Sequence, residues 1–189
     1  AHFNHHLRAA ESDRDESFVR DWCSAHDIPF VSGSGDVRGL AEREGLSLEE
    51  AARKLRYDFL RQEAEKLGQH IKIYTAHHAD DNAETILFNL IRGTGVAGLT
   101  GMAYQQNGIC RPLLDVTREE LAAYAAARHI PHVEDTTNAD PGAAARNFLR
   151  LEVMPRLRQI NPRAVEHIND AGRRLRVADQ SLEEEAGRR

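Results

Sequence analysis

The polar segment 75–85 holds the residues of this sequence that are best suited to catalysis. It follows the apolar segment 71–75 and runs into a segment with apolar residues at helical spacing. At about 100° per residue, His77, Asp81 and Glu84 fall within roughly 60° of one another on a helix, if His77 lies in or near its first turn. One imidazole and two carboxylates on one stripe predict a catalytic or ligand-binding site.

The residues alone leave two uses of this group open. Asp81 and Glu84 could bind a divalent cation, since carboxylates are ordinary Mg²⁺ ligands. Histidine and carboxylates are also the usual general bases that deprotonate a nucleophile. A structural interpretation is that Asp80 and Asp81 cap the helix, whose dipole favours carboxylates there. A cap explains neither His77 nor Glu84, so the functional interpretation is favoured.

A second polar segment, 135–140, is rich in Asp and Asn and follows a predicted strand at 130–133. Such residues are typical of turns. Arg146 lies just before an apolar helical segment, and the N-terminus of a helix favours anions. Arg146 could therefore fix a phosphate at this helix start.

Two glycine-rich segments resemble nucleotide-binding loops only in part. Residues 93–98 have G-x-G-x-x-G spacing but follow a helix, whereas the dinucleotide-binding motif follows a strand. We expect a helix C-cap and a tight turn there. Residues 32–36 follow a strand but lack the phosphate-loop pattern and a convincing helix after it, so we expect a loop.

Alternating strands and helices must position these side chains. We expect a helix from Ser12, a strand at 29–31, a helix capped by Ser47 and Glu50 and ended by Gly68, a strand at 71–75, a helix ended by Gly93, a loop to about Leu114, a helix capped by Thr117 and Glu120, and a strand at 130–133. The predicted fold class is α/β, a doubly wound parallel sheet with flanking helices. In such sheets ligands bind at the carboxyl ends of the strands.

From Phe148 onward only helices are expected, with a break at Asn161-Pro162. We therefore predict a catalytic domain at 1–160, followed at 161–189 by a helical linker or the start of a further domain.

The 189 residues carry a net charge of −5, which taken alone argues against a nucleic-acid partner. The charge is uneven, because residues 143–176 hold eight arginines and three acidic residues, which leaves −10 for the rest. Such a run is either a solvated face or a phosphate-binding surface. No stretch reaches the roughly 18 apolar residues of a membrane-spanning helix. Two distant cysteines favour a reducing cytoplasm.

Several motifs occur together in a fixed order. They are His2-x-Asn-His5-x-Leu-Arg8, Ser47-Leu-Glu-Glu-Ala-Ala-Arg53-x-x-Arg56-Tyr57, His77-His78-x-Asp80-Asp81-x-x-Glu84-Thr85, the glycine-rich run 93–102, Arg111-Pro-Leu-Leu114, Asp135-x-Thr-Asn138 and Arg146-Asn147. In this order they resemble the catalytic domain of bacterial tRNA(Ile)-lysidine synthetases, which belong to the PP-loop ATP pyrophosphatase superfamily with its adenine nucleotide alpha hydrolase-like fold. The similarity covers residues 1–165.

The resemblance implies a ligase that uses ATP and Mg²⁺ to form a carbon–nitrogen bond. Enzymes of this family adenylate C2 of the wobble cytidine in the CAU anticodon of tRNA(Ile), and lysine then displaces AMP to give lysidine. By analogy His77, Asp81 and Glu84 would form the catalytic stripe, with Asp81 and Glu84 binding metal or lysine. Arg146 would meet the activated intermediate or a phosphate. The residues implied to contact tRNA are Arg53, Arg56, Arg150 and Arg173, and a homodimer is left open.

The chain departs from the family pattern in one respect. The ATP-binding motif of the family, Ser-Gly-Gly-x-Asp-Ser, does not occur in the 189 residues, and the run from Ser32 differs from it in place and at Ser34 and Val37. The chain also begins without Met. We therefore expect an N-terminally truncated catalytic domain whose ATP-binding residues are unknown.

Three rival interpretations remain. A tRNA thiolation enzyme of the same superfamily usually carries Cys-x-x-Cys pairs, whereas Cys23 and Cys110 stand far apart. A two-metal phosphohydrolase would need adjacent His and Asp side chains of segment 77–81 in one cluster, which a regular element does not provide. A catalytically inactive tRNA-binding fragment is supported by the missing ATP-binding motif.

The first prediction concerns activity. The 189 residues alone are expected to form no lysidine, because they lack the motif that binds ATP in the family. Incubating the purified chain with ATP, lysine and tRNA and measuring lysine incorporation checks this, and turnover would refute it.

Overall fold

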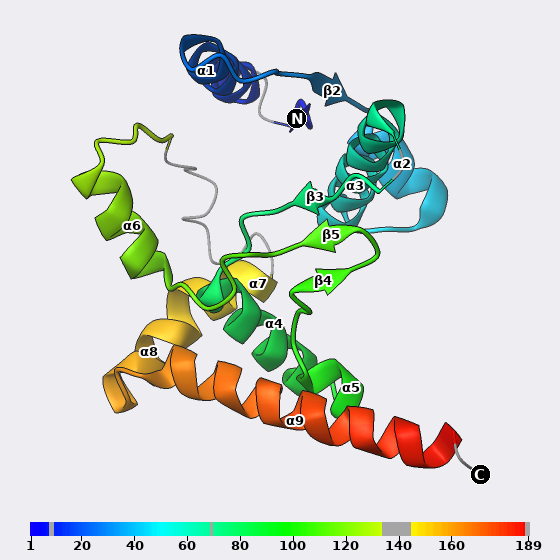
Figure 1. Ribbon diagram of the computed structural model, residues 1–189, viewed down its shortest axis with the longest axis vertical. Coiled ribbons are helices and arrows are strands. Elements are labelled where there is room, and N and C mark those ends of the chain that lie inside the picture. The colour runs from blue at the N-terminus through cyan, green and yellow to red at the C-terminus, as the bar shows by residue number, and fades with distance from the viewer. Residues whose placement is uncertain (8–9, 69, 134–144, 188–189) are drawn as a thin grey trace. The chain divides into compact units, whose positions relative to one another are not determined.

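The computed structural model describes residues 1–7, 10–68, 70–133 and 145–187. The chain divides into two compact units, Ala1–Ile73 and Tyr74–Arg189, which are described separately (Figure 1). The described strands form a two-stranded and a three-stranded sheet among a larger number of helices. No described helix combines the length and the apolar character that crossing a membrane requires.

In the first unit, strands β1 (His2–Asn4) and β2 (Ser32–Ser34) pair in parallel and are connected through helix α1 (Ala10–Ala25). The strand predicted at 29–31 is wrong, because the paired residues are 32–34. Gly33 gives the physical reason. A Cβ at Gly33 would come within 2.5 Å of the Phe59 ring, so the strand is placed where an aromatic side chain can pack against bare backbone.

Residues 32–36, predicted as a loop without a convincing helix after it, hold β2 and the N-cap of helix α2 (Val37–Glu44), so that prediction is wrong. Asp36 caps the helix by accepting a hydrogen bond from the Gly39 N–H at 2.8 Å. Gly45 ends it with a φ of 65°, a left-handed conformation that glycine adopts at little cost. The sequence therefore held a signal for this helix that the prediction did not use, namely the capping residues Asp36 and Gly45 at its two ends.

Helix α3 (Leu48–Leu67) has the predicted capping box of Ser47 and Glu50 and ends before Gly68. It packs against α2 and closes the core of the first unit. That core consists of the buried residues Val37, Leu40, Ala41 and Ala51.

The second sheet has the strand order β3-β5-β4, with β3 at Ile73–Tyr74, β4 at Gln105–Gln106 and β5 at Ile109–Cys110. β4 and β5 form an antiparallel hairpin. Its turn residues, Asn107 and Gly108, have φ values of 50° and 77°. Asn-Gly is the pair that tight hairpin turns favour, so a clear signal lay inside the loop predicted before Leu114.

The strand predicted at 130–133 is wrong. None of these residues lies in a strand. The Ile130 N–H instead donates to the Ala125 carbonyl at 2.9 Å, which closes the end of helix α6 (Arg118–Ala127). The capping box of Thr117 and Glu120 predicted at the start of α6 is confirmed.

The other elements described in the second unit are helical. They are α4 (Ala79–Ile91), α5 (Val96–Leu99), α7 (Ala145–Phe148), the π-helical turn η2 (Leu149–Val153), α8 (Met154–Ile160) and α9 (Ala164–Gly187). Gly93 follows α4 with a φ of 75°, as expected for a helix end and turn. The predicted break at Asn161 separates α8 from α9.

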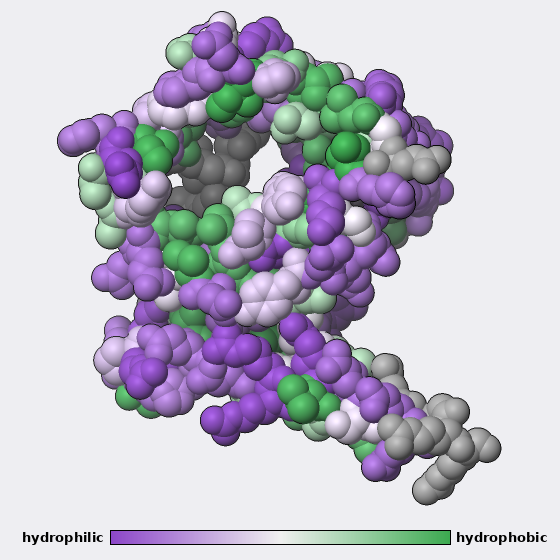
Figure 2. All heavy atoms as spheres, in the orientation of Figure 1, coloured by the Kyte–Doolittle hydropathy of each residue, from purple (hydrophilic) through white to green (hydrophobic). Residues whose placement is uncertain are grey.

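Helix α9 lies along α4 and α5 (Figure 1). Hydrophilic side chains cover most of the face of α9 that Figure 2 shows. Its inner face includes Val165, which joins the buried cluster of Ala79, Ala83 and Met154. The division at residue 160 between a catalytic domain and a linker stays a prediction.

A buried pair of asparagines fixes α9 to α4. Asn82 Nδ2 donates to Asn169 Oδ1 at 3.0 Å, and Asn169 Nδ2 donates to the Ala79 carbonyl at 2.9 Å. Asn82 Oδ1 also accepts from the Met102 N–H at 2.6 Å. Because both side chains are buried, these bonds replace contacts with water and hold the first turn of α4 in one place.

We expect Asn169→Ala to lower the free energy of unfolding by about 2 kcal/mol, since Asn82 and the Ala79 carbonyl would stay buried without their partners. Gln180→Ala, at an exposed position of the same helix, should change it by less than about 0.5 kcal/mol. Urea unfolding followed by circular dichroism measures both variants. Equal effects would mean that the asparagine pair does not anchor α9.

Candidate active site

The site lies where β3 ends and α4 begins. His78 is the N-cap of α4, and its backbone N–H donates to Asp81 Oδ2 at 3.1 Å. Asp80 and Asp81 lie in the first turn, where the helix dipole stabilises negative charge. A parallel bridge between His78 and Leu113 fixes the point from which the helix leaves the sheet. The polar segment therefore follows the carboxyl end of β3, as predicted.

Asp81 and Glu84 bind the same guanidinium group. Arg150 donates from Nε and Nη2 to the two carboxylate oxygens of Glu84, both at 3.0 Å, and its Nη2 lies 3.5 Å from Asp81 Oδ1. The Glu84 side chain is 3% exposed, and a carboxylate so deeply buried needs a paired, hydrogen-bonded cation. The structure thus brings together two of the three residues of the predicted stripe.

His77 does not join them. The backbone of His78 is extended, with a φ of −121°, so α4 starts after it and His77 precedes the first turn. The Nδ1 of His77 lies 2.9 Å from Thr75 Oγ1. The ring of His78 is the imidazole near the carboxylates, with nitrogens 3.5 Å from Asp81 and 3.8 Å from Asp80. The spacing argument assumed that His77 lies in or near the first turn of the helix, whereas the helix begins after His78.

Asp80 is a site residue for which the sequence suggested only a capping role. It is 6% exposed and accepts the Arg118 N–H at 2.8 Å, while its other oxygen pairs with the Arg158 guanidinium. This one carboxylate therefore fixes the start of α6 and the end of α8 to α4. The available signal was the doubled Asp80-Asp81, because a helix cap needs only one of them.

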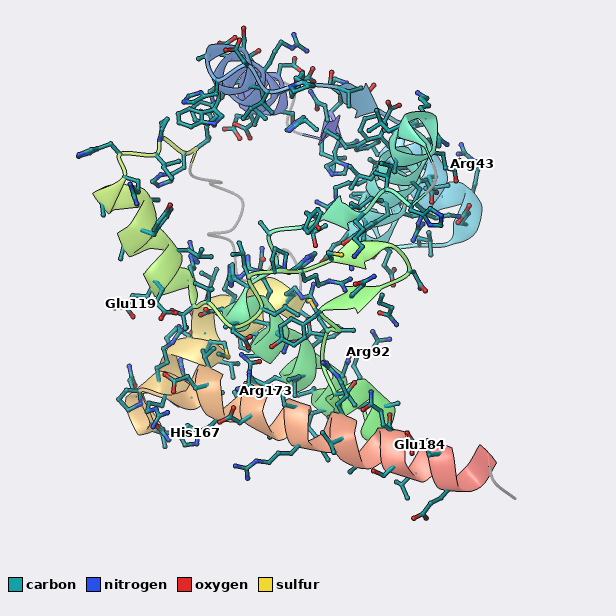
Figure 3. The ribbon with its side chains drawn as sticks, in the orientation of Figure 1. Arg43, Arg92, Glu119, His167, Arg173 and Glu184 are labelled. Atoms are coloured by element: carbon teal, nitrogen blue, oxygen red, sulfur yellow. The ribbon has the colours of Figure 1, made fainter. Side chains whose placement is uncertain are left out.

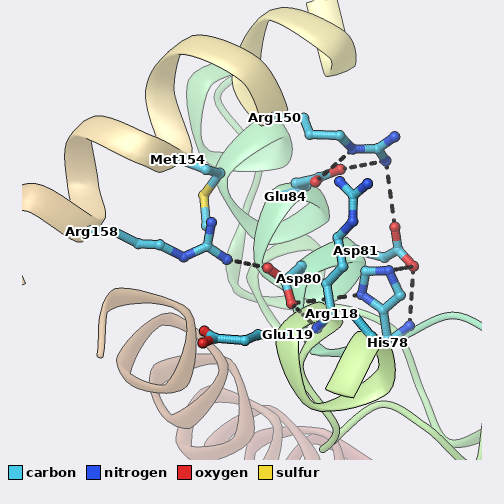
Figure 4. A pocket seen from close by; sticks show the side chains of 10 residues that line it. His78, Asp80, Asp81, Glu84, Arg118, Glu119, Arg150, Met154 and Arg158 are labelled. Atoms are coloured by element: carbon cyan, nitrogen blue, oxygen red, sulfur yellow. Dashed lines mark hydrogen bonds and ion pairs between the residues drawn. The ribbon is translucent and has the colours of Figure 1, made fainter. Parts of the chain in front are cut away.

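These residues line a pocket of about 560 Å³ in the second unit (Figure 4). Glu119, Ala122 and Met154 complete its lining, and His77 is not part of it. The volume is typical of sites for small molecules. Two acid–arginine pairs, Arg150 with Glu84 and Arg158 with Asp80, are drawn as dashed lines across it in Figure 4.

Arg146 lies beside the stripe rather than in the pocket. Its Nη2 donates to Thr85 Oγ1 at 2.9 Å, and the same hydroxyl donates to the Asp81 carbonyl at 2.8 Å. Arg150 comes from the π-helical turn η2, directly after the helix that carries Arg146. Such turns are rare and frequently occur at functional sites.

The arginines predicted to contact tRNA lie in different surroundings. Arg150 is in the pocket. Arg173, labelled on α9 in Figure 3, pairs with Asp115 at 2.7 Å and with Asp170. Asp115 also accepts a hydrogen bond from the Tyr104 hydroxyl at 2.6 Å. Burial together with this hydrogen bond raises the pKa of Tyr104 above its usual value.

Arg53 and Arg56 belong to the first unit and are exposed on α3. Their guanidinium carbons lie 4.8 and 5.9 Å from the centre of the Tyr57 ring, and that of Arg61 lies 5.9 Å from it. Cations at these distances are attracted to the ring face, which holds three positive charges close together on one helix.

Within residues 1–7, 10–68, 70–133 and 145–187, no group of three or more His, Cys, Asp or Glu side chains is placed to hold a metal ion. Asp81 and Glu84, the predicted metal ligands, face Arg150. Mg²⁺ commonly takes one or two carboxylates besides phosphates and water, so a metal role for this pair stays a proposal. Arg8 and the segment 135–140 lie outside the described residues.

A family model described as a PP-loop domain matches residues 1–157. The chain belongs to the PP-loop domain family. It is 45% identical over 163 residues to a tRNA(Ile)-lysidine synthase of Porphyromonas gingivalis, which covers 86% of this chain and 36% of that protein. Proteins with the same name from Parabacteroides distasonis and Geobacter sulfurreducens are 42% and 43% identical, over 94% and 98% of this chain and 40% and 38% of their own length.

These matches confirm the resemblance predicted from the motifs, and this PP-loop chain spans less than half of the length of the three relatives. A solved structure, the U34-tRNA thiolase NcsA from Methanococcus maripaludis with its [4Fe-4S] cluster, matches 92% of the chain and 59% of its own length with a TM-score of 0.69. At 17% identity this likeness shows the fold alone. It confirms the predicted α/β class.

We expect Arg150→Met to lower the free energy of unfolding by about 2 to 4 kcal/mol, because Glu84 would remain buried without its cation. The double variant Arg150→Met with Glu84→Gln should recover most of the loss, since no buried charge is then left. Arg156→Met is a matched control: Arg156 pairs with Glu152 on the surface, where both side chains are well exposed, and should cost less than about 0.5 kcal/mol.

Urea unfolding of the three variants and the wild-type chain measures these differences. If Arg150→Met were as harmless as Arg156→Met, the guanidinium would not be what stabilises the Glu84 carboxylate.

Proposed function

We propose that the protein ligates lysine to C2 of the wobble cytidine in a tRNA(Ile) with a CAU anticodon, at the expense of ATP and through an adenylated tRNA. The observation that carries the proposal is the Asp81–Glu84 pair, whose carboxylates bind the guanidinium group of Arg150 in a pocket of suitable size. A site that binds a guanidinium has the charge and the hydrogen-bond acceptors to bind an ammonium group. The relatives named tRNA(Ile)-lysidine synthase support lysidine formation on tRNA(Ile).

The chemistry has two steps. In the first, the C2 carbonyl oxygen of the cytidine attacks the α-phosphorus of ATP, and pyrophosphate leaves. In the second, a lysine amine attacks C2, the C2–O bond breaks, AMP leaves with that oxygen, and the amine gives up its proton. An ammonium has no lone pair, so it must be deprotonated before it attacks.

The residues of the site would divide this work. Asp81 and Glu84 would hold and orient the amine, and Asp81 is the more available partner, because its Oδ1 lies 3.5 Å from Arg150 whereas both Glu84 oxygens lie at 3.0 Å. A carboxylate or His77 would accept the proton. Arg146 would stabilise the charge of the departing phosphate.

ATP would bind at the carboxyl ends of β1 and β2, where a cavity of about 410 Å³ is lined by His5, Ser34, Asp36 and Arg38 among others. Ends of parallel strands are the usual place for nucleotides in α/β sheets. Mg²⁺ would neutralise charge on the transferring phosphate, and binding it is the alternative role of Asp81 and Glu84, in place of holding the amine.

The tRNA would be contacted by Arg53, Arg56 and Arg173 through phosphates, since their side chains are exposed. Arg150 lines the pocket, so it could meet only the nucleotide that enters it. These substrates imply a cytoplasmic protein. A homodimer stays open, because none of these steps requires a second copy.

A tRNA thiolase is the second candidate, favoured by the solved structure of that class. An iron–sulfur cluster is ordinarily held by three or four cysteines, and this chain has two, Cys23 in α1 and Cys110 in β5. We therefore place ligation first. A catalytically inactive tRNA-binding fragment is the third candidate.

The test uses the natural protein, at the length that its gene encodes, with ATP, labelled lysine and tRNA transcripts carrying CAU or GAU anticodons. We expect lysine incorporation into the CAU transcript only. Glu84→Gln should lower kcat/KM by about 10²- to 10⁴-fold, because a carboxylate that positions the amine is lost. Glu166→Gln, which removes an exposed acid from α9, should leave it unchanged.

Sulfur incorporation in place of lysine would select the thiolase. Binding of the tRNA without any reaction would select the inactive fragment. Equal activity of Glu84→Gln and the wild-type protein would remove the stripe from the mechanism.

A further inference from the structure

Three arginines from three different elements reach the pocket described above. Arg150 and Arg158 are each committed to a buried carboxylate, Glu84 and Asp80 respectively. Arg118, the first residue of α6, is different. Its backbone N–H donates to Asp80, but among the described residues no hydrogen bond or ion pair reaches its guanidinium group.

The Arg118 side chain is exposed and lines the pocket. Figure 4 shows it extending from α6 over the pocket, while the side chain of its neighbour Glu119 points in another direction. Its backbone is held by Asp80, so the side chain starts from a fixed position. An exposed, planar guanidinium that lines a polar pocket and has no partner among the described residues is well suited to bind an oxyanion through two parallel hydrogen bonds.

The charge of the pocket indicates which oxyanion. Its lining carries four carboxylates, those of Asp80, Asp81, Glu84 and Glu119, against three guanidinium groups. The net charge of −1 disfavours a phosphate group, which carries one or two negative charges and no compensating cation. Lysine has two ammonium groups and one carboxylate, a net charge of +1, and so matches both the sign and the mixture of charges in the pocket.

We propose that Arg118 binds the α-carboxylate of the lysine substrate and thereby selects a free amino acid over a simple amine. The inference rests on the proposed function. Asp81, whose Oδ1 lies 3.5 Å from Arg150, would bind the cationic part of the substrate beside Glu84, and Arg118 on α6 would bind its one anionic group. Neither contact alone distinguishes lysine from a diamine or from another amino acid, but the two together do.

The test compares lysine with lysinamide, in which a neutral amide replaces the carboxylate, in the ligation assay of the natural protein. We expect Arg118→Gln to raise the KM for lysine by about 10- to 100-fold, with a smaller change in kcat, and to leave the KM for lysinamide nearly unchanged. Arg118→Lys should fall in between, because it keeps the charge and loses the fork. Calorimetric titration of lysine into the protein without tRNA gives a second readout that needs no turnover.

Arg128→Gln is the matched control, since Arg128 ends the same helix with its guanidinium 5.7 Å from the Tyr124 ring and does not line the pocket. It should leave both KM values unchanged. Equal losses with lysine and lysinamide, together with a higher KM for ATP or tRNA, would show that Arg118 binds a phosphate and would overturn the proposal. No change in any constant would show a solvated surface arginine and would overturn it too.

These outcomes are separable from a failure of the proposed function. If the wild-type protein forms no lysidine, ligation itself is wrong. If it does so and Arg118→Gln behaves like the wild type, only the assignment of Arg118 is wrong.

Discussion

The pairing of buried carboxylates at the start of α4 with arginines from the C-terminal helices is the constraint on which the second unit depends. Glu84 and Asp80 are almost fully buried, and an ionised carboxylate without a partner in such a place costs several kcal/mol. Their partners, Arg150 and Arg158, lie 66 and 78 residues further along the chain. The turn that carries the catalytic candidates is therefore stable only with η2 and α8 packed on it. The shape and the charge of the pocket depend on the same contacts, because the side chains that neutralise the acids are also part of its wall.

A second contact, between uncharged side chains, fixes α4 relative to α9 and to the segment after α5. The amides of Asn82 and Asn169 are mutually bonded and also reach the Ala79 carbonyl and the Met102 N–H, so α9 and the segment after α5 are held to the same turn of α4. On one side of α4 the contacts are neutral and buried, and on the other they are ionic and face the pocket. A helix held on both sides in this way keeps the side chains of Asp81 and Glu84 in a constant orientation in the pocket. Preorganisation of that kind is what a site needs in order to hold an amine near a reacting carbon.

The sequence predicted the parts of this design that depend on local spacing. The capping boxes at Ser47 and Thr117, the shared face of Asp81 and Glu84 and the break at Asn161 follow from rules that act within one or two helical turns. Predictions failed where a distant contact decided the outcome. The strand at 32–34 is set by the Phe59 ring over Gly33, and the missing strand at 130–133 by a backbone bond to Ala125. His77 was predicted to share a helical face with Asp81 and Glu84, but the backbone of His78 is extended and the helix begins only after it. The Arg150–Glu84 pair could not be predicted at all, since nothing local links two residues so far apart.

The arginine–carboxylate pairs change the interpretation of the arginine-rich segment 143–176. Its net positive charge indicated either a solvated face or a surface for nucleic acid. Several of its arginines instead form ion pairs with carboxylates of other helices. The cost of releasing each one depends on burial. Arg173 and Arg163 form surface pairs worth at most about 1 kcal/mol, so a phosphate can take their place at little cost. Releasing Arg150 would leave Glu84 unpaired in the interior at a cost of about 2 to 4 kcal/mol. An anionic ligand would therefore displace the exposed pairs of Arg163 and Arg173 before the buried pair of Arg150, which keeps the pocket in shape.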